Sequence, residues 1–90
     1  MPLTVFGGKI HVVDTPDQAT HALEVLRGHK IVGIDTETKP TFARGQHHKV
    51  ALLQISTLDD CFLFRLNKMG LPAELGVFLS DKKIKKIGLA

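Results

Sequence analysis

The sequence predicts an α/β fold built on a mixed sheet, in which one parallel strand joins an antiparallel meander. Strand and helix patterns follow one another in the order β-α-β-β-β-α-β. Three of the strands are connected by short or hairpin links, which pair strands antiparallel, whereas the helical crossover returns the last strand parallel to the central one. With 90 residues, the chain makes one domain at most.

The first strand and the first helix have clear local signals. Residues 9–13 (KIHVV) form a short strand pattern after a pair of glycines. A helix is predicted over residues 16–27, because Thr15 can cap it, a proline occupies its first position and Gln18 completes a capping box. Its apolar residues recur with helical spacing at Ala19, Ala22, Leu23 and Leu26. We expect Gly28 to end the helix in the left-handed conformation.

The middle of the chain predicts two strands separated by a polar loop. Residues 31–37 form the central strand, and the loop over residues 39–49 contains a proline and a glycine. Residues 50–56 (VALLQIS) are apolar enough for a strand that is covered on both faces. Gln54 is the polar exception in this strand, and we expect it to satisfy a neighbouring backbone group.

The last third predicts a hairpin, a helix and a final strand. Turn residues 57–60 lead into a strand over residues 61–66, and turn chemistry accounts for the two aspartates of this turn. A helix over residues 71–79 has a proline near its start, and a strand follows over residues 84–90. The apolar side of that helix is formed by Leu71, Leu75, Phe78 and Leu79.

Composition indicates a globular chain. Hydrophobic residues make up 43% and charged residues 23% of the sequence, and no apolar run is long enough for a membrane span. The start of the chain lacks the pattern of a secretory signal, so we expect a cytoplasmic protein. Cys61 is the single cysteine, and its apolar neighbours predict a buried structural thiol. A net charge of +3 permits a polyanionic partner without requiring one.

Two carboxylates end the central strand. Asp35 and Glu37 are two residues apart, so a strand directs both side chains to the same face while Thr36 points to the other. Two acids held together in this way suggest a site for a hard divalent cation, for which Mg²⁺ or Mn²⁺ is best suited. The alternative is a solvated strand end, because an Asp-x-Glu tripeptide also occurs by chance.

A cationic loop follows this pair. It carries Lys39, Arg44 and Lys49, which could contact phosphate groups or could simply be solvated.

Four segments together resemble a known family. The segments IVGIDTET, KVALLQIS, CFLFRL and KKIGLA occur in the same order and at similar separations as in the amino-terminal half of the DEDD 3′–5′ exonucleases, in the branch of ribonuclease D and the Werner-type enzymes. The resemblance covers the chain from about residue 9 onward and implies a ribonuclease H-like fold. It also implies hydrolytic removal of nucleotides from the 3′ end of DNA or RNA with two divalent metal ions.

The resemblance assigns roles to individual residues. Asp35 matches the aspartate that bridges both metal ions in the family, and Glu37 matches its partner on one of them. The backbone around Thr36 and Thr38 would lie against the terminal nucleotide. Phosphate contacts would come from Lys39, Arg44 and Lys49.

The family's later motifs have no counterpart in the chain. The sequence contains no tyrosine, and its last acid, Asp81, precedes the final strand. We therefore expect residues 1–90 to be the amino-terminal half of an exonuclease domain that is catalytically inactive alone. Two alternatives stay open: a noncatalytic module that binds nucleic acid or a protein, and a fragment that associates with copies of itself through an open sheet.

Overall fold

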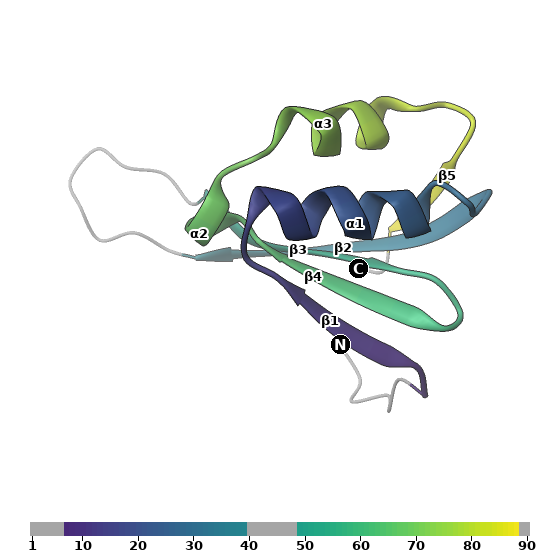
Figure 1. The fold of residues 1–90 in the computed structure, drawn as a ribbon, viewed down its shortest axis with the longest axis horizontal. Helices are drawn as coiled ribbons and strands as arrows, with labels where there is room; N and C mark the ends of the chain where they lie inside the picture. Colours follow the sequence, from purple (N-terminus) through teal and green to yellow (C-terminus); the bar gives the residue numbers. More distant parts are fainter. Residues whose placement is uncertain (1–6, 40–48, 89–90) are drawn as a thin grey trace.

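The computed structural model describes residues 7–39 and 49–88, which form one five-stranded sheet and three helices (Figure 1). The elements in chain order are β1 (Lys9–Val13), α1 (Pro16–Leu26), β2 (Ile31–Lys39), β3 (Lys49–Ser56), β4 (Asp60–Arg65), α2 (Leu66–Met69), α3 (Ala73–Ser80) and β5 (Lys85–Gly88). The strand order across the sheet is β1-β4-β3-β2-β5. No helix in the described ranges combines the length and the apolar character that crossing a membrane requires.

The predicted mixed sheet is confirmed. β2, β3 and β4 pair antiparallel, and β5 returns parallel to β2, with Ile31 opposite Lys85 and Ile34 opposite Gly88. β1 adds a second parallel pair along the outer edge of β4. The predicted strand over residues 84–90 is shorter in the structure, and residues 89–90 lie outside the described part.

The capping box at the start of α1 is confirmed in detail. The Thr15 hydroxyl accepts a hydrogen bond from the Gln18 backbone N–H, at 3.2 Å, and the Gln18 side-chain oxygen accepts one from the Thr15 backbone N–H. The predicted end of this helix was wrong, because Gly28 does not adopt the left-handed conformation. Arg27 caps the helix with right-handed backbone angles, and the N–H groups of Arg27 and Gly28 donate to carbonyls within the last turn.

The segment after β4 differs from the prediction. The strand ends at Arg65, and the short helix α2 follows, which the sequence analysis did not predict. Gly70 then reverses the chain with φ of 72°, a value that glycine adopts without strain. Pro72 has an extended ψ of 145°, so α3 begins after it, and Leu71 is 61% exposed instead of contributing to the apolar side of the helix.

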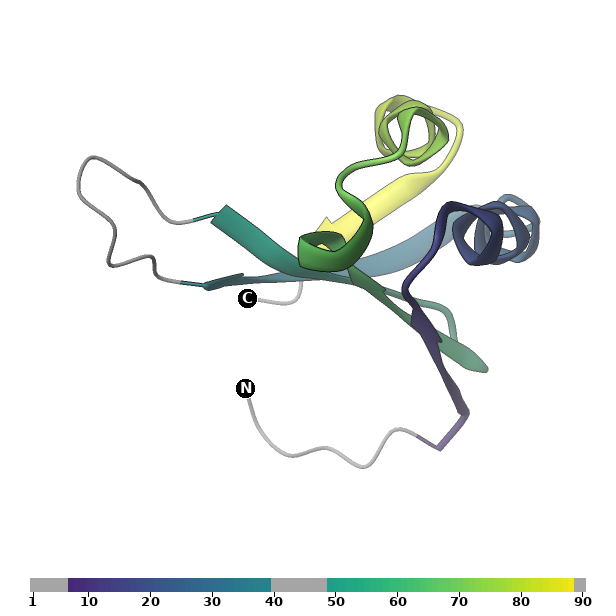
Figure 2. The ribbon, with the colours of Figure 1, turned by 60° about the vertical axis from the view of Figure 1, so that its left-hand side comes forward.

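All three helices lie on the same face of the sheet, as Figure 2 shows for α1 and α3. This helix-covered face contains Leu53 and Ile55 of β3, which pack with Phe62 and Phe64 of β4. The expectation that β3 is covered on both faces was therefore wrong for the described residues. An apolar run shows that a strand is hydrophobic, but it does not show where helices dock. The buried core consists of Val13, Ala19, Ala22, Leu23, Leu26, Val32, Leu53, Ile55, Phe62, Phe64, Leu75, Phe78 and Ile84.

The opposite, open face of the sheet leaves aliphatic side chains in contact with solvent. The register places Ile10, Val12, Ile31 and Ile87 on this face, and they are 60%, 49%, 56% and 44% exposed. Within the described residues, no helix covers them (Figure 2).

The capping box predicts the effect of Thr15→Ala. Losing the side-chain acceptor leaves a backbone N–H of the first turn of α1 without its partner, so we expect the free energy of unfolding to fall by about 1 kcal/mol. Urea denaturation followed by circular dichroism measures this change. Thr15→Ser is the matched control, and it should retain most of the stability because its hydroxyl can accept the same hydrogen bond. Equal losses in both variants would contradict the capping role.

Candidate metal and nucleic-acid site

β2 places Asp35 and Glu37 together on the open face of the sheet. Asp35 lies opposite Gln54 of β3 and Glu37 lies opposite Leu52, so the two acids follow the regular alternation of the strand. Asp35 is half-buried and Glu37 is exposed. The register shifts between Glu37 and Thr38, which is a bulge of the kind often found beside functional sites.

The donor set suits a hard divalent cation but is incomplete. No ion pair joins Asp35 or Glu37 to any other side chain that the structure describes. Two neighbouring carboxylates without such partners fit Mg²⁺ or Mn²⁺, which prefer oxygen ligands. The described residues contain no group of three His, Cys, Asp or Glu side chains that could hold a metal ion. A metal bound here would need additional ligands from water, from a substrate or from other residues.

Gln54 is a neighbour of the carboxylate pair that the sequence analysis did not connect to it. Its side chain is half-buried and lies beside the Cys61 thiol. The expectation that Gln54 satisfies a backbone group stays a prediction. Burial raises the pKa of Cys61, and the contact with Gln54 lowers it by a smaller amount. The thiol is 5% exposed, as predicted, and stays protonated at neutral pH. Only the register between β2 and β3, which the apolar pattern does not specify, brings Gln54 beside Asp35.

The other predicted site residues fall in different places. Thr36 shares the helix-covered face with Leu53, and Thr38 lies beyond the bulge. Lys39 and Lys49 were predicted to lie in the loop, but they form the last pair of the β2–β3 ladder. Arg44 lies outside the described residues.

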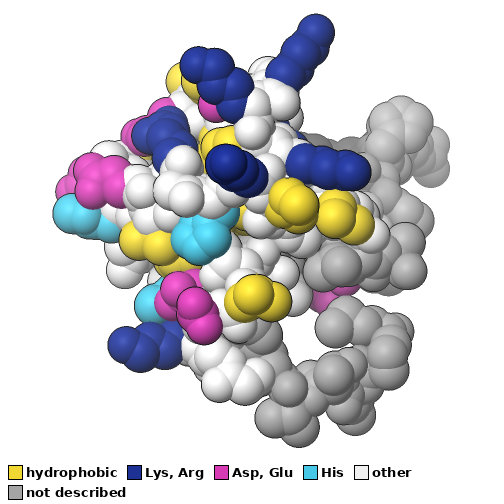
Figure 3. All heavy atoms as spheres, turned by 90° about the vertical axis from the view of Figure 1, so that its right-hand side faces the viewer, with side chains coloured by type: hydrophobic (Ala, Val, Ile, Leu, Met, Phe, Trp, Pro, Cys, Tyr) yellow, Lys and Arg dark blue, Asp and Glu magenta, His cyan; other side chains and the backbone are white. Residues whose placement is uncertain are grey.

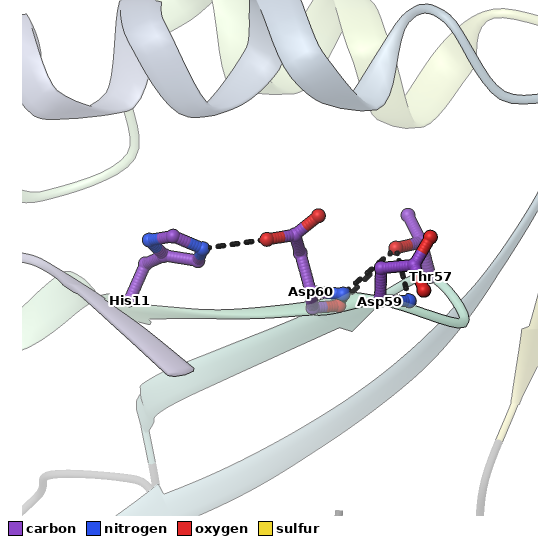
Figure 4. Close-up of polar contacts among 4 residues, drawn as sticks. All are labelled: His11, Thr57, Asp59 and Asp60. Atoms are coloured by element: carbon purple, nitrogen blue, oxygen red, sulfur yellow. Dashed lines mark hydrogen bonds and ion pairs between the residues drawn. The ribbon is translucent and has the colours of Figure 1, made fainter. Parts of the chain in front are cut away.

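A second polar cluster lies at the opposite end of the sheet (Figure 4). His11 Nε2 and Asp60 Oδ1 are 2.8 Å apart, and the His11 ring stacks on Phe62 at a centroid distance of 4.6 Å. Turn chemistry alone therefore does not account for Asp60, because its carboxylate joins β1 to β4. The turn is held instead by the Thr57 hydroxyl, which accepts hydrogen bonds from the backbone N–H groups of Asp59 and Asp60.

Comparison with protein families agrees with this geometry. The family described as 3′–5′ exonuclease matches residues 10–90. The chain therefore belongs to the 3′–5′ exonuclease domain family, and its sheet is the ribonuclease H-like sheet of the DEDD enzymes. Among curated proteins, it is 34% identical over 61 residues to the bifunctional 3′–5′ exonuclease/ATP-dependent helicase WRN of Mus musculus.

Solved structures show the same fold. The Aedes aegypti Nibbler EXO domain superposes with a TM-score of 0.75 at 26% identity, covering 90% of this chain. Trypanosoma brucei RNase D in complex with RNA U12 superposes with a TM-score of 0.69 at 25% identity, covering 92% of this chain. Escherichia coli RNase D superposes with a TM-score of 0.76 over 90% of this chain. Because its sequence identity is 21%, it supports the fold alone.

The chain spans only part of these relatives. It covers 4% of the mouse protein, 38% of the Nibbler chain, 30% of the Trypanosoma chain and 21% of the Escherichia chain.

The carboxylate pair predicts weak and specific metal binding by the chain itself. Two carboxylates are too few to replace the hydration shell of the ion, so we expect Mn²⁺ to bind with a dissociation constant of about 1 mM or weaker. Asp35→Asn should abolish this binding, as measured by the electron paramagnetic resonance signal of free Mn²⁺. Glu24→Gln removes one exposed carboxylate from α1 and should leave binding unchanged. Equal losses in the two variants would show nonspecific ion association.

Proposed function

We propose that Asp35 and Glu37 are the first two metal ligands of a 3′–5′ exonuclease that hydrolyses phosphodiester bonds of nucleic acid. The observation that carries the proposal is the placement of both acids on one open face, at the end of β2, in a chain of this family. Divalent metal ions are general among DEDD exonucleases, and the oxygen donors of this pair suit them.

The two acids have different surroundings, which support different roles. Asp35 is half-buried beside Gln54, so its carboxylate is confined and suits the position shared by two metal ions. Glu37 is exposed and sits next to the bulge, where its longer side chain can reach one ion. When bound, the two ions would activate the attacking water and stabilise the leaving 3′ oxygen. The backbone of Thr36 and Thr38 would position the terminal nucleotide.

We also propose that residues 1–90 correspond to the amino-terminal half of the catalytic domain and are inactive alone. The proposal is supported by the small share of the solved relatives that the chain covers, 38% of the Nibbler chain and 30% of the Trypanosoma chain. The nucleic-acid partner is supported by a structural relative that was solved with RNA U12.

The exonuclease assignment predicts the effect of Asp35→Asn in a protein that carries the remainder of the domain. Neutralising the shared ligand should lower nucleotide release by at least about 100-fold, because two cations lose a common anionic partner. Release from a 3′-labelled oligonucleotide in Mg²⁺ or Mn²⁺ measures the rate, and an unchanged circular dichroism spectrum shows that the fold is intact. Glu24→Gln is the control. Activity within tenfold of the parent protein would contradict the assignment.

A noncatalytic binding module is the second candidate, and the net charge of +3 favours it for the chain alone. It would be supported by salt-dependent oligonucleotide binding that is indifferent to Asp35→Ala, together with no nuclease activity in the longer protein.

Self-association of the chain stays a prediction, and the exposed aliphatic side chains of the open face favour it. We expect the sedimentation coefficient to rise with concentration and this rise to be reduced by Val12→Lys, which places a charge on the open face. Val77→Lys is the matched control, because Val77 is also exposed, at 65% compared with 49% for Val12, but lies on α3. A monomer at all concentrations would exclude self-association.

A further inference from the structure

The outer edge of the sheet along β1 presents backbone groups to which another strand can pair. The strand order β1-β4-β3-β2-β5 places no described strand on the outer side of β1. The Lys9 backbone N–H donates to the Asp59 carbonyl at 2.8 Å, so Lys9 directs its backbone groups toward β4. Because successive residues of a strand direct these groups to opposite sides, the N–H and C=O groups of Ile10 and Val12 point outward. This row of groups is a template for strand pairing.

The two edges of the sheet differ in their protection. β5, at the other edge, has four residues, and two of them are Lys85 and Lys86. Lys and Arg side chains also gather at the end of the molecule where β5 begins (Figure 3). β1 has five residues without a proline or a bulge, and after Lys9 it carries no Lys, Arg, Asp or Glu. Charges, prolines and bulges keep natural edge strands from pairing, so β1 lacks the protection that β5 has.

The side chains around β1 leave room for a strand at this edge. A hollow of about 370 Å³ lies between α1 and β1, and its lining includes His11, His21 and Val25. Val25 is 46% exposed, although it is an apolar residue of α1. On the other face of β1, the side chains of Ile10 and Val12 are exposed. A strand added to β1 would therefore contact α1 on one face and aliphatic side chains on the other.

One antiparallel register between β1 and a second β1 pairs all of the outward groups. When two copies pair about His11, Ile10 lies opposite Val12 of the second copy, and these residues exchange backbone hydrogen bonds. The same register makes cross-strand pairs of their aliphatic side chains. Centring the pairing on Ile10 would instead place Val12 opposite Gly8. Centring it on Val12 would place Ile10 opposite Asp14.

The charges at the ends of β1 are complementary in this register. The two copies of Lys9 lie at opposite ends of the pairing, so like charges stay apart. Each Lys9 lies at the same end as Asp14 of the second copy, which brings opposite charges close. The β1 edge is therefore self-complementary in both its apolar and its charged residues.

We propose that the β1 edge binds β1 of a second copy of this chain and joins the two sheets into one continuous sheet. Such an interface is isologous, because the same edge serves both copies, and it closes at a dimer. It differs from association through the open face, since it depends on backbone hydrogen bonds at the edge. Five residues of strand and one side of a helix make a small interface. We therefore expect a reversible dimer with a dissociation constant in about the micromolar range or weaker.

Cysteine cross-linking of the full chain tests the register. In the proposed pairing the two copies of His11 are directly opposite, with Cα atoms about 4.5 Å apart, which a disulfide can bridge. His11→Cys should therefore become mostly disulfide-linked dimer when oxidised glutathione accepts the two electrons. Lys9→Cys is the matched control on the same face of β1, and it should not cross-link because about 13 Å separates its two copies. The parent chain, in which Cys61 is 5% exposed, should not cross-link either.

Sedimentation tests the dimer without an added cysteine. Val12→Pro removes one outward N–H from each copy, and an edge strand tolerates proline where the N–H faces outward, so the fold should be retained. We expect the dissociation constant of the dimer to rise by about tenfold or more, because each copy loses a backbone hydrogen bond. Val12→Thr is the matched control, since it keeps the N–H and the branched shape, and it should dimerise nearly as well as the parent chain.

The inference would be overturned by a parent chain that stays monomeric up to about 1 mM. Equal cross-linking of Lys9→Cys and His11→Cys, or equal weakening by Val12→Pro and Val12→Thr, would also overturn it. If the parent chain associates but His11→Cys gives no disulfide-linked dimer, the β1 edge is not the interface and the open face is the associating surface.

Discussion

The register between β2 and β3 is the constraint on which the candidate site depends. With Ile34 opposite Ile55, Val32 and Ile34 of β2 face the helices and Asp35 faces the open side. A slip of one residue would turn Asp35 to the helix-covered face beside Leu53 and Ile55, and it would bring Ile34 into solvent. Burying a carboxylate without a partner costs far more than exposing one isoleucine. The hydrophobic core therefore determines where the acids lie, although neither acid belongs to the core.

The same constraint gives the sheet two electrostatically different ends. β2 and β5 run in parallel, so lysines at the entry to β5 stand at the end opposite the acids at the exit of β2. Opposite charges are thereby kept apart, with lysines at the end where β2 and β5 begin and the carboxylate pair at the end of β2.

The sequence predicted a structural feature correctly where the contact that produces it joins residues close together in the chain. The capping box of Thr15 and Gln18 involves atoms three residues apart, and it was predicted in full. The termination of α1 was not, because backbone hydrogen bonds within its last turn replaced the left-handed glycine that the sequence suggested. α2 has four residues, which is too short for an apolar periodicity to show. Asp60 was explained by its turn, whereas its carboxylate contacts a histidine 49 residues away.

The sequence by itself determined the order of the elements apart from α2, and it determined the family and that Asp35 and Glu37 share one face of a strand. These properties follow from spacing along the chain and from the alternation of side chains, which are local. Only the tertiary structure decided that this face is the open one, that Gln54 lies beside Asp35, and that Lys30 meets Lys85. The physical reason is that strand pairing between distant segments sets these contacts, and a one-dimensional pattern of apolar residues is compatible with more than one pairing.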